Sequence, residues 1–276
     1  MTVNYLLVNL DNYQDKSLDV KGTANSTQRW KNIFKENNFN EINWLENKTA
    51  TKENILVELT KLILRTKENE LAIFVFIGHG SKKLIPEKEL QQQIGVTEDD
   101  NRDEILFAYD KVIIDNELRN IFNLKKPETQ LLVFIDACNA NSSMNMQYSA
   151  FNNLKTKPKN ELVFLASSNF EKAKILDFDN KPYSIFSYFF TEIIAENEAI
   201  NYYELFTKAS EKVTKENPAQ HINLLYTNVE LLSKKLFSNE SIASIDEAKI
   251  KEKNIYKETI YTTVLEEIKI NQLKIK

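Results

Sequence analysis

Two side chains capable of nucleophilic chemistry stand at the ends of two largely apolar runs. Cys138, the only cysteine of the chain, follows residues 131–137, and His79, one of two histidines, follows residues 71–77. Short apolar runs bounded by polar segments are typical of buried parallel strands, and in open α/β sheets functional groups gather beyond the carboxyl ends of strands. If these strands are neighbours, the imidazole can take the proton that a nucleophilic thiol must lose.

A simpler interpretation of the cysteine must be weighed against this one. Unpaired cysteine is often a small buried hydrophobic residue with no chemical role. The histidine at a matching strand end favours the catalytic interpretation, because a nucleophile and its base are expected at the same edge of a sheet. We therefore treat Cys138 and His79 as a candidate catalytic pair.

Alternating strand and helix patterns surround these two runs. Apolar runs predict strands at residues 3–10, 42–45, 71–79, 131–138, 162–166 and 222–226, and helical spacing predicts helices at 23–35, 52–65, 116–122, 183–195 and 203–214. The polar segments 81–110 and 139–160 are expected to be loops. The alternation favours a wound α/β layer structure in one domain.

Composition excludes several classes of function. A net charge of −4 gives no electrostatic reason to expect nucleic acid or an anionic membrane as a partner, and no apolar stretch is long enough to span a bilayer. A single cysteine cannot form an internal disulfide, and residues 1–5 lack the basic region of a secretory signal. We therefore expect a cytoplasmic protein.

The predicted domain organisation follows from a change in the sequence pattern near residue 233. An apolar share of 42% is sufficient for a substantial core, which we place at residues 1–232. Residues 233–276 are predicted to be a C-terminal extension of unknown role. Its final part alternates apolar and polar residues, a pattern that fits either an added strand or hairpin or a segment that binds a partner.

Further motifs, taken in order, resemble the caspase-like cysteine peptidases, most closely the metacaspases. Besides the strand–His–Gly and strand–Asp–x–Cys pair, the matching segments are residues 20–25, 99–105, 109–110, 113–118, 162–168 and 186–188. Each motif alone is weak, but the ordered set is specific and covers about residues 1–232. The resemblance implies a caspase-like fold, which is a mostly parallel sheet flanked by helices in three layers.

The resemblance also implies a role for each residue of the catalytic pair. Cys138 would be the nucleophile, and His79 would relay its proton to the leaving amine. The backbone amides of Gly80 and Cys138 would donate to the oxyanion of the tetrahedral intermediate. Gly80 suits this place because a residue without a side chain lets the substrate approach the backbone closely. His221, which opens the last predicted strand, would be structural.

A substrate pocket is implied on the same strand as the cysteine. Asp136 lies two residues before Cys138 and therefore points to the same side. In metacaspases the aspartate at this position helps to form an acidic pocket that gives cleavage after Arg or Lys. Two pocket positions depart from the family, because Ser26 replaces an acidic residue and Ile77 replaces a small hydroxyl residue. Asp136 capping a loop remains the alternative.

The acidic segment before the third predicted helix indicates Ca²⁺ as an activator, because many metacaspases need it and calcium prefers several oxygen ligands. By motif position Asp103 and Asp115 match metal ligands of the family, while Asn116 and Asn145 stand where further aspartates are expected. The lost negative charge predicts weaker calcium control than in the family, and a charge run is usually only a solvated loop. No cofactor is expected to be required.

The sequence thus predicts a cysteine endopeptidase with a protein or peptide substrate. The lysines in residues 155–159 make the loop after Cys138 a candidate for self-cleavage if the specificity is basic, although they serve solubility equally well. Two alternatives stay open. A pseudo-peptidase that keeps the fold as a scaffold is favoured by the departures at Ser26 and Ile77. A caspase-like effector would be switched by a regulatory partner through residues 233–276.

Overall fold

The computed structural model describes residues 1–84, 102–138, 160–168, 171–197, 199–242 and 255–257. Residues 139–159 of the predicted loop 139–160, which include Asn145 and the lysines of residues 155–159, lie outside the described residues. The alternating pattern near the C-terminus, in residues 258–276, lies outside them as well.

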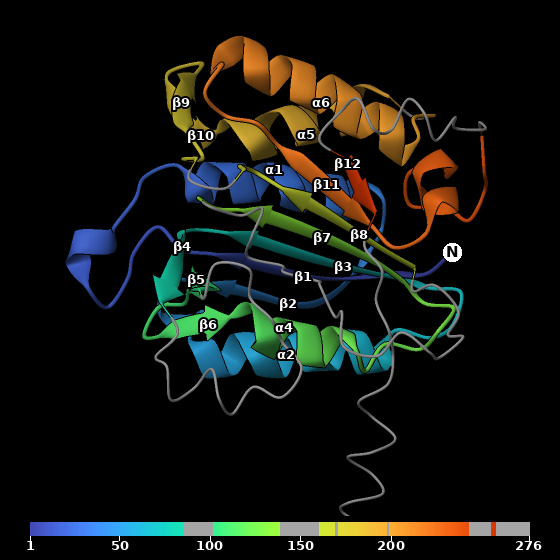
Figure 1. Ribbon diagram of the computed structural model, residues 1–276, viewed down its shortest axis with the longest axis horizontal. Helices are drawn as coiled ribbons and strands as arrows, with labels where there is room; N and C mark the ends of the chain where they lie inside the picture. Colours follow the sequence, from blue (N-terminus) through green and yellow to red (C-terminus); the bar gives the residue numbers. More distant parts are fainter. Residues whose placement is uncertain (85–101, 139–159, 169–170, 198, 243–254, 258–276) are drawn as a thin grey trace, which may run out of the picture.

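A seven-stranded sheet forms the middle layer of the molecule (Figure 1). In spatial order its strands are β12 (Ile255–Lys257), β11 (Asn223–Tyr226), β8 (Asn160–Leu165), β7 (Gln130–Asp136), β3 (Leu71–Ile77), β1 (Val3–Asn9) and β2 (Asn40–Glu46). All neighbours from β8 to β2 are parallel, whereas β11 runs antiparallel to β8 and parallel to β12. The predicted mostly parallel sheet is confirmed.

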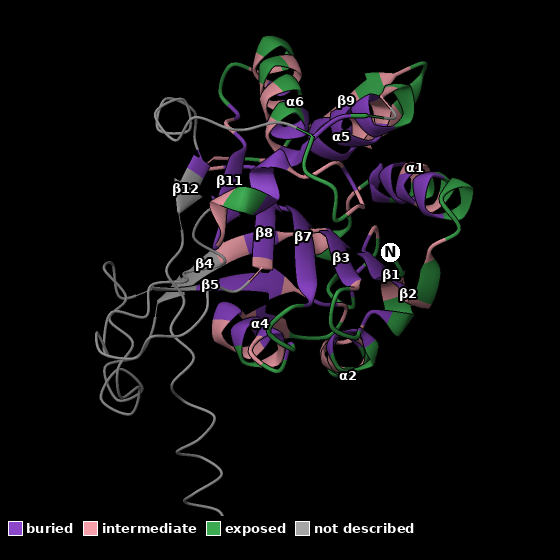
Figure 2. Cartoon of the chain, turned by 90° about the vertical axis from the view of Figure 1, so that its right-hand side faces the viewer, coloured by how far each residue is buried: buried purple, intermediate pink, exposed green. Residues whose placement is uncertain are grey.

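Helices cover both faces of this sheet (Figures 1 and 2). One face carries α1 (Thr23–Glu36), α5 (Ile185–Glu196) and α6 (Tyr202–Glu216), and the other carries α2 (Lys52–Arg65) and α4 (Asp115–Phe122). In β7, Leu132 and Phe134 belong to the core on the α1 side, while Leu131 and Val133 belong to the core on the α2 side. Burial on both faces is why the central strands are continuously apolar.

Smaller elements depart from the sequence prediction. The segment 81–110, expected to be a loop, contains β4 (Gly80–Leu84) and β5 (Arg102–Phe107), which form a sheet with β6 (Val112–Ile114). A hairpin of β9 (Ile175–Phe178) and β10 (Lys181–Ser184) takes the first residues of the predicted helix 183–195. Each of these short strands pairs only within its own small sheet. The local sequence pattern therefore predicts these strands poorly. The described part of the chain also contains the 3₁₀ turns η1 (Lys16–Leu18), η2 (Asn47–Thr49) and η3 (Val229–Ser233).

The chain just beyond residue 232 packs against the predicted domain. Leu236 is buried, and the ring of Phe237 packs edge to face against Phe39 with centroids 5.0 Å apart. The backbone N–H of Phe237 donates to the hydroxyl of Tyr202 at 3.1 Å. The boundary at 232 stays a prediction, but the start of the extension packs against the core. Among the described residues no helix has the length and apolar character needed to cross a membrane.

Candidate active site

The register of two neighbouring strands brings the predicted catalytic residues to one place. Ile77 of β3 pairs with Asp136 of β7 in a parallel ladder. His79 and Cys138 each lie two residues beyond that pair, so both leave the sheet at the same level. This is the carboxyl edge of the sheet, where α/β proteins place their functional groups.

Gly80 lies directly against the cysteine. A Cβ atom built on it would be 2.5 Å from the carbonyl oxygen of Cys138 and 3.1 Å from the Cβ of Ala137. The glycine is therefore needed for packing between β4 and the segment after β7, a different reason from the expected approach of substrate. The N–H of Phe107 donates to the carbonyl of His79 at 3.0 Å. Hydrogen-bonded and non-hydrogen-bonded pairs alternate along an antiparallel ladder, so the next pair, Gly80 with Leu106, is not hydrogen-bonded. The backbone N–H of Gly80 consequently points away from β5.

The imidazole of His79 is held by groups that the sequence did not reveal. Its Nε2 lies 2.9 Å from the carbonyl oxygen of Leu18. Because a carbonyl only accepts, Nε2 carries the proton and Nδ1 is the basic nitrogen. The His79 backbone N–H donates to the hydroxyl of the buried Tyr13 at 2.9 Å, and the rings of Tyr13 and Phe107 lie 5.3 and 6.3 Å from the imidazole. A backbone carbonyl such as that of Leu18 leaves no signal in sequence.

Hydrogen bonds fix the segment that presents this carbonyl. The carboxylate of Asp11 accepts from the backbone N–H and the hydroxyl of Thr23 at 3.0 and 2.6 Å, at the start of α1. Asp19 accepts from the N–H of Tyr13 at 2.8 Å. The side chain of Asn47 accepts from the N–H of Asp11 at 2.9 Å. The segment between β1 and α1 is therefore ordered by short polar side chains of its own and by Asn47 of η2, which together set the place of the Leu18 carbonyl.

Cys138 is half-buried, and side chains of both charges lie near it. Its Sγ lies 3.9 Å from the carbonyl oxygen of Ala173, within hydrogen-bond distance for sulfur. Burial raises the pKa of the Cys138 thiol, Asp136 adds to the rise, and Lys172 and Lys174 oppose it. Among the described residues the partner of the thiol is this carbonyl, so the resting structure favours the protonated sulfur.

Asp136 is enclosed by hydroxyl groups. The hydroxyl of Ser184 donates to it at 2.6 Å, and the hydroxyl of Ser187 donates to its second oxygen. Ser187 also receives the indole N–H of Trp30 at 3.0 Å, and Ser26 accepts from the backbone N–H of Ser184 at 3.0 Å. Burial raises the pKa of the Asp136 carboxyl to about 6. The acid therefore forms the centre of a closed polar network beside the catalytic edge.

The other predicted pocket residues occupy different environments. Ser26 is fully buried in α1 and donates to the carbonyl of Gly22 at 3.2 Å. The structure thus brings Ser26 and Asp136 together through Ser184. Ile77 is a buried member of the core on the α1 side. Their role in binding substrate stays a prediction.

Of the four predicted calcium ligands, the structure describes the side chains of Asp115 and Asn116, so the calcium site stays a prediction. Asp115 is buried in the first turn of α4, where it accepts from the N–H of Asn116 at 2.7 Å. For Asp103 the structure describes only the backbone, in β5, and Asn145 lies outside the described residues. No group of three or more His, Cys, Asp or Glu in the described part of the chain is arranged to hold a metal. We derive no step through calcium.

The second histidine has a partner of its own. The Nδ1 atom of His221 lies 2.7 Å from Glu171, and the same carboxylate accepts from the backbone N–H groups of His221 and Ser168 at 2.8 and 3.1 Å. These contacts tie the start of β11 to the segment after β8. The structural role of His221 stays a prediction.

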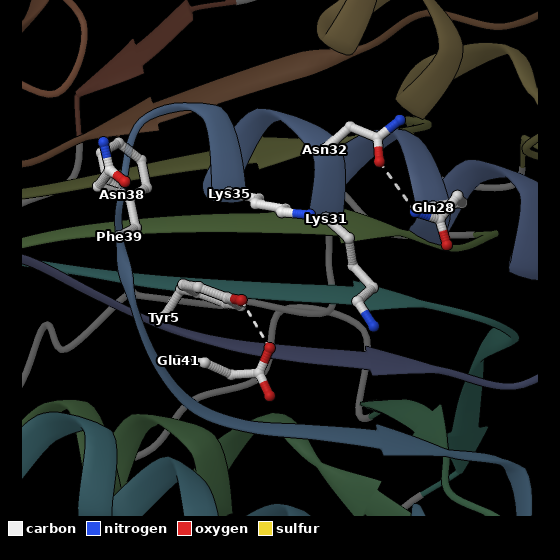
Figure 3. Close-up of a pocket in the computed structure, with 8 residues that line it drawn as sticks. All are labelled: Tyr5, Gln28, Lys31, Asn32, Lys35, Asn38, Phe39 and Glu41. Atoms are coloured by element: carbon white, nitrogen blue, oxygen red, sulfur yellow. Dashed lines mark hydrogen bonds between the residues drawn. The ribbon is translucent and has the colours of Figure 1, made fainter.

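A cavity of about 630 Å³ lies between α1 and the edge strand β2 (Figure 3). Its lining is mostly polar and consists of Tyr5, Gln28, Lys31, Asn32, Lys35, Asn38, Phe39 and Glu41. The Tyr5 hydroxyl donates to Glu41 at 2.6 Å, near the amino ends of β1 and β2. His79 and Cys138 follow the carboxyl ends of their strands, so this cavity is no part of the candidate site.

The fold and site define an α/β protein with a wound sheet and with a cysteine and a histidine beyond the carboxyl ends of adjacent strands. Comparison with known proteins identifies the family to which it belongs. Residues 5–237 match the family model of the caspase domain, Peptidase_C14. The chain therefore belongs to the caspase-domain family, which confirms the predicted resemblance.

Individual relatives agree with this assignment. The chain is 29% identical over 152 residues to Metacaspase-1 of Plasmodium falciparum, a match that spans 50% of this chain and 24% of that protein. It is 30% identical over 103 residues to Metacaspase-1A of Aspergillus terreus, spanning 36% of this chain and 24% of that protein. The chain thus matches about a quarter of the length of each relative.

A solved structure resembles the whole fold. The crystal structure of the protein GSU0716 from Geobacter sulfurreducens aligns with a TM-score of 0.65 and 15% sequence identity. The alignment covers 86% of this chain and 99% of that one. At this identity the likeness concerns the fold alone, and it supports the three-layer α/β architecture.

Proposed function

We propose that the protein is a cysteine endopeptidase that hydrolyses proteins or peptides with Cys138 as nucleophile and His79 as general base and acid. Membership of the caspase-domain family supports cysteine peptidase activity. The assignment of catalytic roles to these two residues rests on the β3–β7 register. Because Ile77 pairs with Asp136, both strands end at the same level, and His79 and Cys138 follow at the same distance. The contact of His79 Nε2 with the Leu18 carbonyl supports it further, because the opposite ring nitrogen then remains basic.

The reaction follows from these positions. Nδ1 of His79 takes the proton of Cys138, and the thiolate sulfur bonds to the carbonyl carbon of the substrate. The oxyanion that forms is stabilised by the amides of Gly80 and Cys138. When the C–N bond breaks, His79 returns its proton to the leaving amine. Water then attacks the thioester, and the bond between carbon and sulfur breaks to release the acid and the free thiol.

We propose a preference for Arg or Lys before the scissile bond, with Asp136 as the acidic residue that selects it. The enclosed carboxylate is held by Ser184 and Ser187. A basic side chain would bring a positive charge to this carboxylate and add the attraction of an ion pair to the hydrogen bond, which the neutral hydroxyl donors cannot supply. Ser26, joined to the same network, is proposed to line this pocket together with Ile77.

The first experiment is turnover of fluorogenic peptides that end in Arg, Lys or Asp, each measured with calcium and with a chelator. Turnover after Arg or Lys should fall by at least about a thousandfold in Cys138→Ala and in His79→Ala. His221→Ala is the matched histidine control and should retain activity. Cleavage after Asp would keep the peptidase but contradict the role of Asp136. A requirement for calcium would assign the ion the activating role that the sequence predicts.

Two other functions remain as outcomes of this experiment. Lack of turnover on every peptide would favour an effector that a partner switches through residues 233–276, and restoration of activity by a cell extract would support it. Lack of turnover under all conditions, together with no labelling of Cys138 by a peptide-directed thiol reagent, would favour a scaffold. The departures at Ser26 and Ile77 are the sequence features in favour of that reading.

A further inference from the structure

A second cavity lies behind two residues that contact the imidazole of His79. It has a volume of about 510 Å³, and Leu18 and Phe107 form part of its wall. Both residues contact the histidine, since the Leu18 carbonyl is 2.9 Å from Nε2 and the Phe107 ring lies edge-on to the imidazole with centroids 6.3 Å apart. The cavity is therefore separated from the histidine by a single layer of residues.

The wall of this cavity is built from ordered elements. Leu18, Phe107 and Val112 supply apolar surface that is partly exposed, from η1, β5 and β6. A turn closes one side, with the N–H of Ala108 donating to the carbonyl of Lys111 at 2.8 Å. The charged residues of the lining, Asp15, Asp110 and Lys111, are all exposed. A bulky apolar side chain fits such a lining better than an acidic one.

The cavity and the Asp136 network lie on opposite sides of the sheet. Leu18 and Phe107 pack against the core on the α2 side. Trp30, which belongs to the Asp136 network, is buried in the core on the α1 side. The strands β3 and β7 carry His79 and Cys138 between these two cores. If the side chain before the scissile bond points to Asp136, the residues after that bond therefore lie beside the histidine.

We propose that this cavity receives a bulky apolar side chain, Leu or Phe, from the first or second residue after the scissile bond. This inference rests on the proposed function, because His79 must protonate the leaving amine and the leaving half must therefore depart along the imidazole. The contact of such a side chain with Leu18 and Phe107 stabilises the leaving half while the bond is broken.

The test compares two classes of substrate. Internally quenched peptides share one sequence before the scissile bond and carry Leu, Phe, Gly or Asp at the two positions after it. A fluorogenic peptide with the same residues before the scissile bond carries a dye as leaving group in place of the residues after it. Its turnover therefore measures the activity of the catalytic pair without any contribution from those residues. We expect kcat/KM about tenfold or more higher with Leu or Phe than with Gly, and lowest with Asp.

Val112→Phe fills the cavity, and Val57→Phe, at an exposed position of α2, is the matched control. Val112→Phe should reduce the preference for Leu and Phe over Gly to within about twofold and should lower dye release far less, whereas Val57→Phe should change neither. Dye release with equal turnover of all four quenched peptides would overturn this inference and leave the proposed function standing. An equal loss on both substrate classes in Val112→Phe, at unchanged thermal stability, would also overturn it. No turnover of either class by the wild type would overturn the proposed function itself.

Discussion

At the scale of single residues, the Cys138 thiol combines partial exposure with a raised pKa. The thiolate is the reactive form, and burial disfavours it. We predict that the rate of alkylation by iodoacetamide keeps rising with pH beyond about pH 9, the usual range for a thiol, rather than levelling near neutrality. Because the chain has one cysteine, labelling of the intact protein reports this group directly. A plateau below pH 8 would mean that an imidazolium–thiolate pair exists at rest.

Asp136 gives a second residue-scale prediction. Burial raises the pKa of its carboxyl from 3.8 to about 6, so the folded protein holds this proton more tightly than the unfolded chain. The contribution to stability is therefore present below pH 4 and is lost as the pH rises through 6. At about 1.4 kcal/mol for each pH unit, the loss is at most about 3 kcal/mol. Urea unfolding of wild type and Asp136→Asn between pH 4 and 7 measures it, since only the wild type should show this component.

If the two proteins have parallel stability profiles across that range, Asp136 does not hold its proton in the way that the enclosed network implies. Ser187→Ala serves as a second variant, because it removes one of the hydroxyl donors to the carboxylate. It should raise the pKa of Asp136 further, since fewer hydrogen bonds then stabilise the ionised form.

At the scale of elements, the approach of β4 to the segment after β7 depends on one glycine. A methyl group at Gly80 would meet the carbonyl oxygen of Cys138 at 2.5 Å, and backbone cannot move aside as a side chain can. We predict that Gly80→Ala lowers the free energy of unfolding by about 1–3 kcal/mol and reduces turnover by displacing Cys138. Ser81→Ala, on the same strand, is the control. Normal stability and turnover in Gly80→Ala would show that the two segments separate readily.

At the scale of the whole molecule, the chain after residue 232 completes the core. Leu236 is buried, Phe237 contacts Phe39, and β12 adds a strand next to β11. We predict that truncation after residue 232 lowers the melting temperature more than truncation after residue 242, because only the shorter protein loses the apolar contacts of Leu236 and Phe237. Differential scanning calorimetry of both truncations measures the difference. Equal melting temperatures would support a domain that ends at 232.

Sequence determined the elements whose signal is local and strong. The central strands are apolar throughout because both of their faces are buried, and α2 follows its helical spacing from Lys52 to Arg65 as predicted. The small sheet of β4, β5 and β6 gave no such signal, since its pairing joins segments on either side of residues 85–101. Its strands also include polar stretches such as residues 80–83, which resemble a loop when taken alone.

For the site, sequence by itself determined which side chains are the candidates for chemistry, because Cys138 and His79 are rare residue types at the ends of recognisable strands. Only the tertiary structure decided their surroundings. The pairing of Ile77 with Asp136 sets both residues at one level, and the Leu18 carbonyl selects the nitrogen of His79 that carries the proton. A ladder register and a backbone carbonyl are relations between distant segments, and no single residue type encodes either of them.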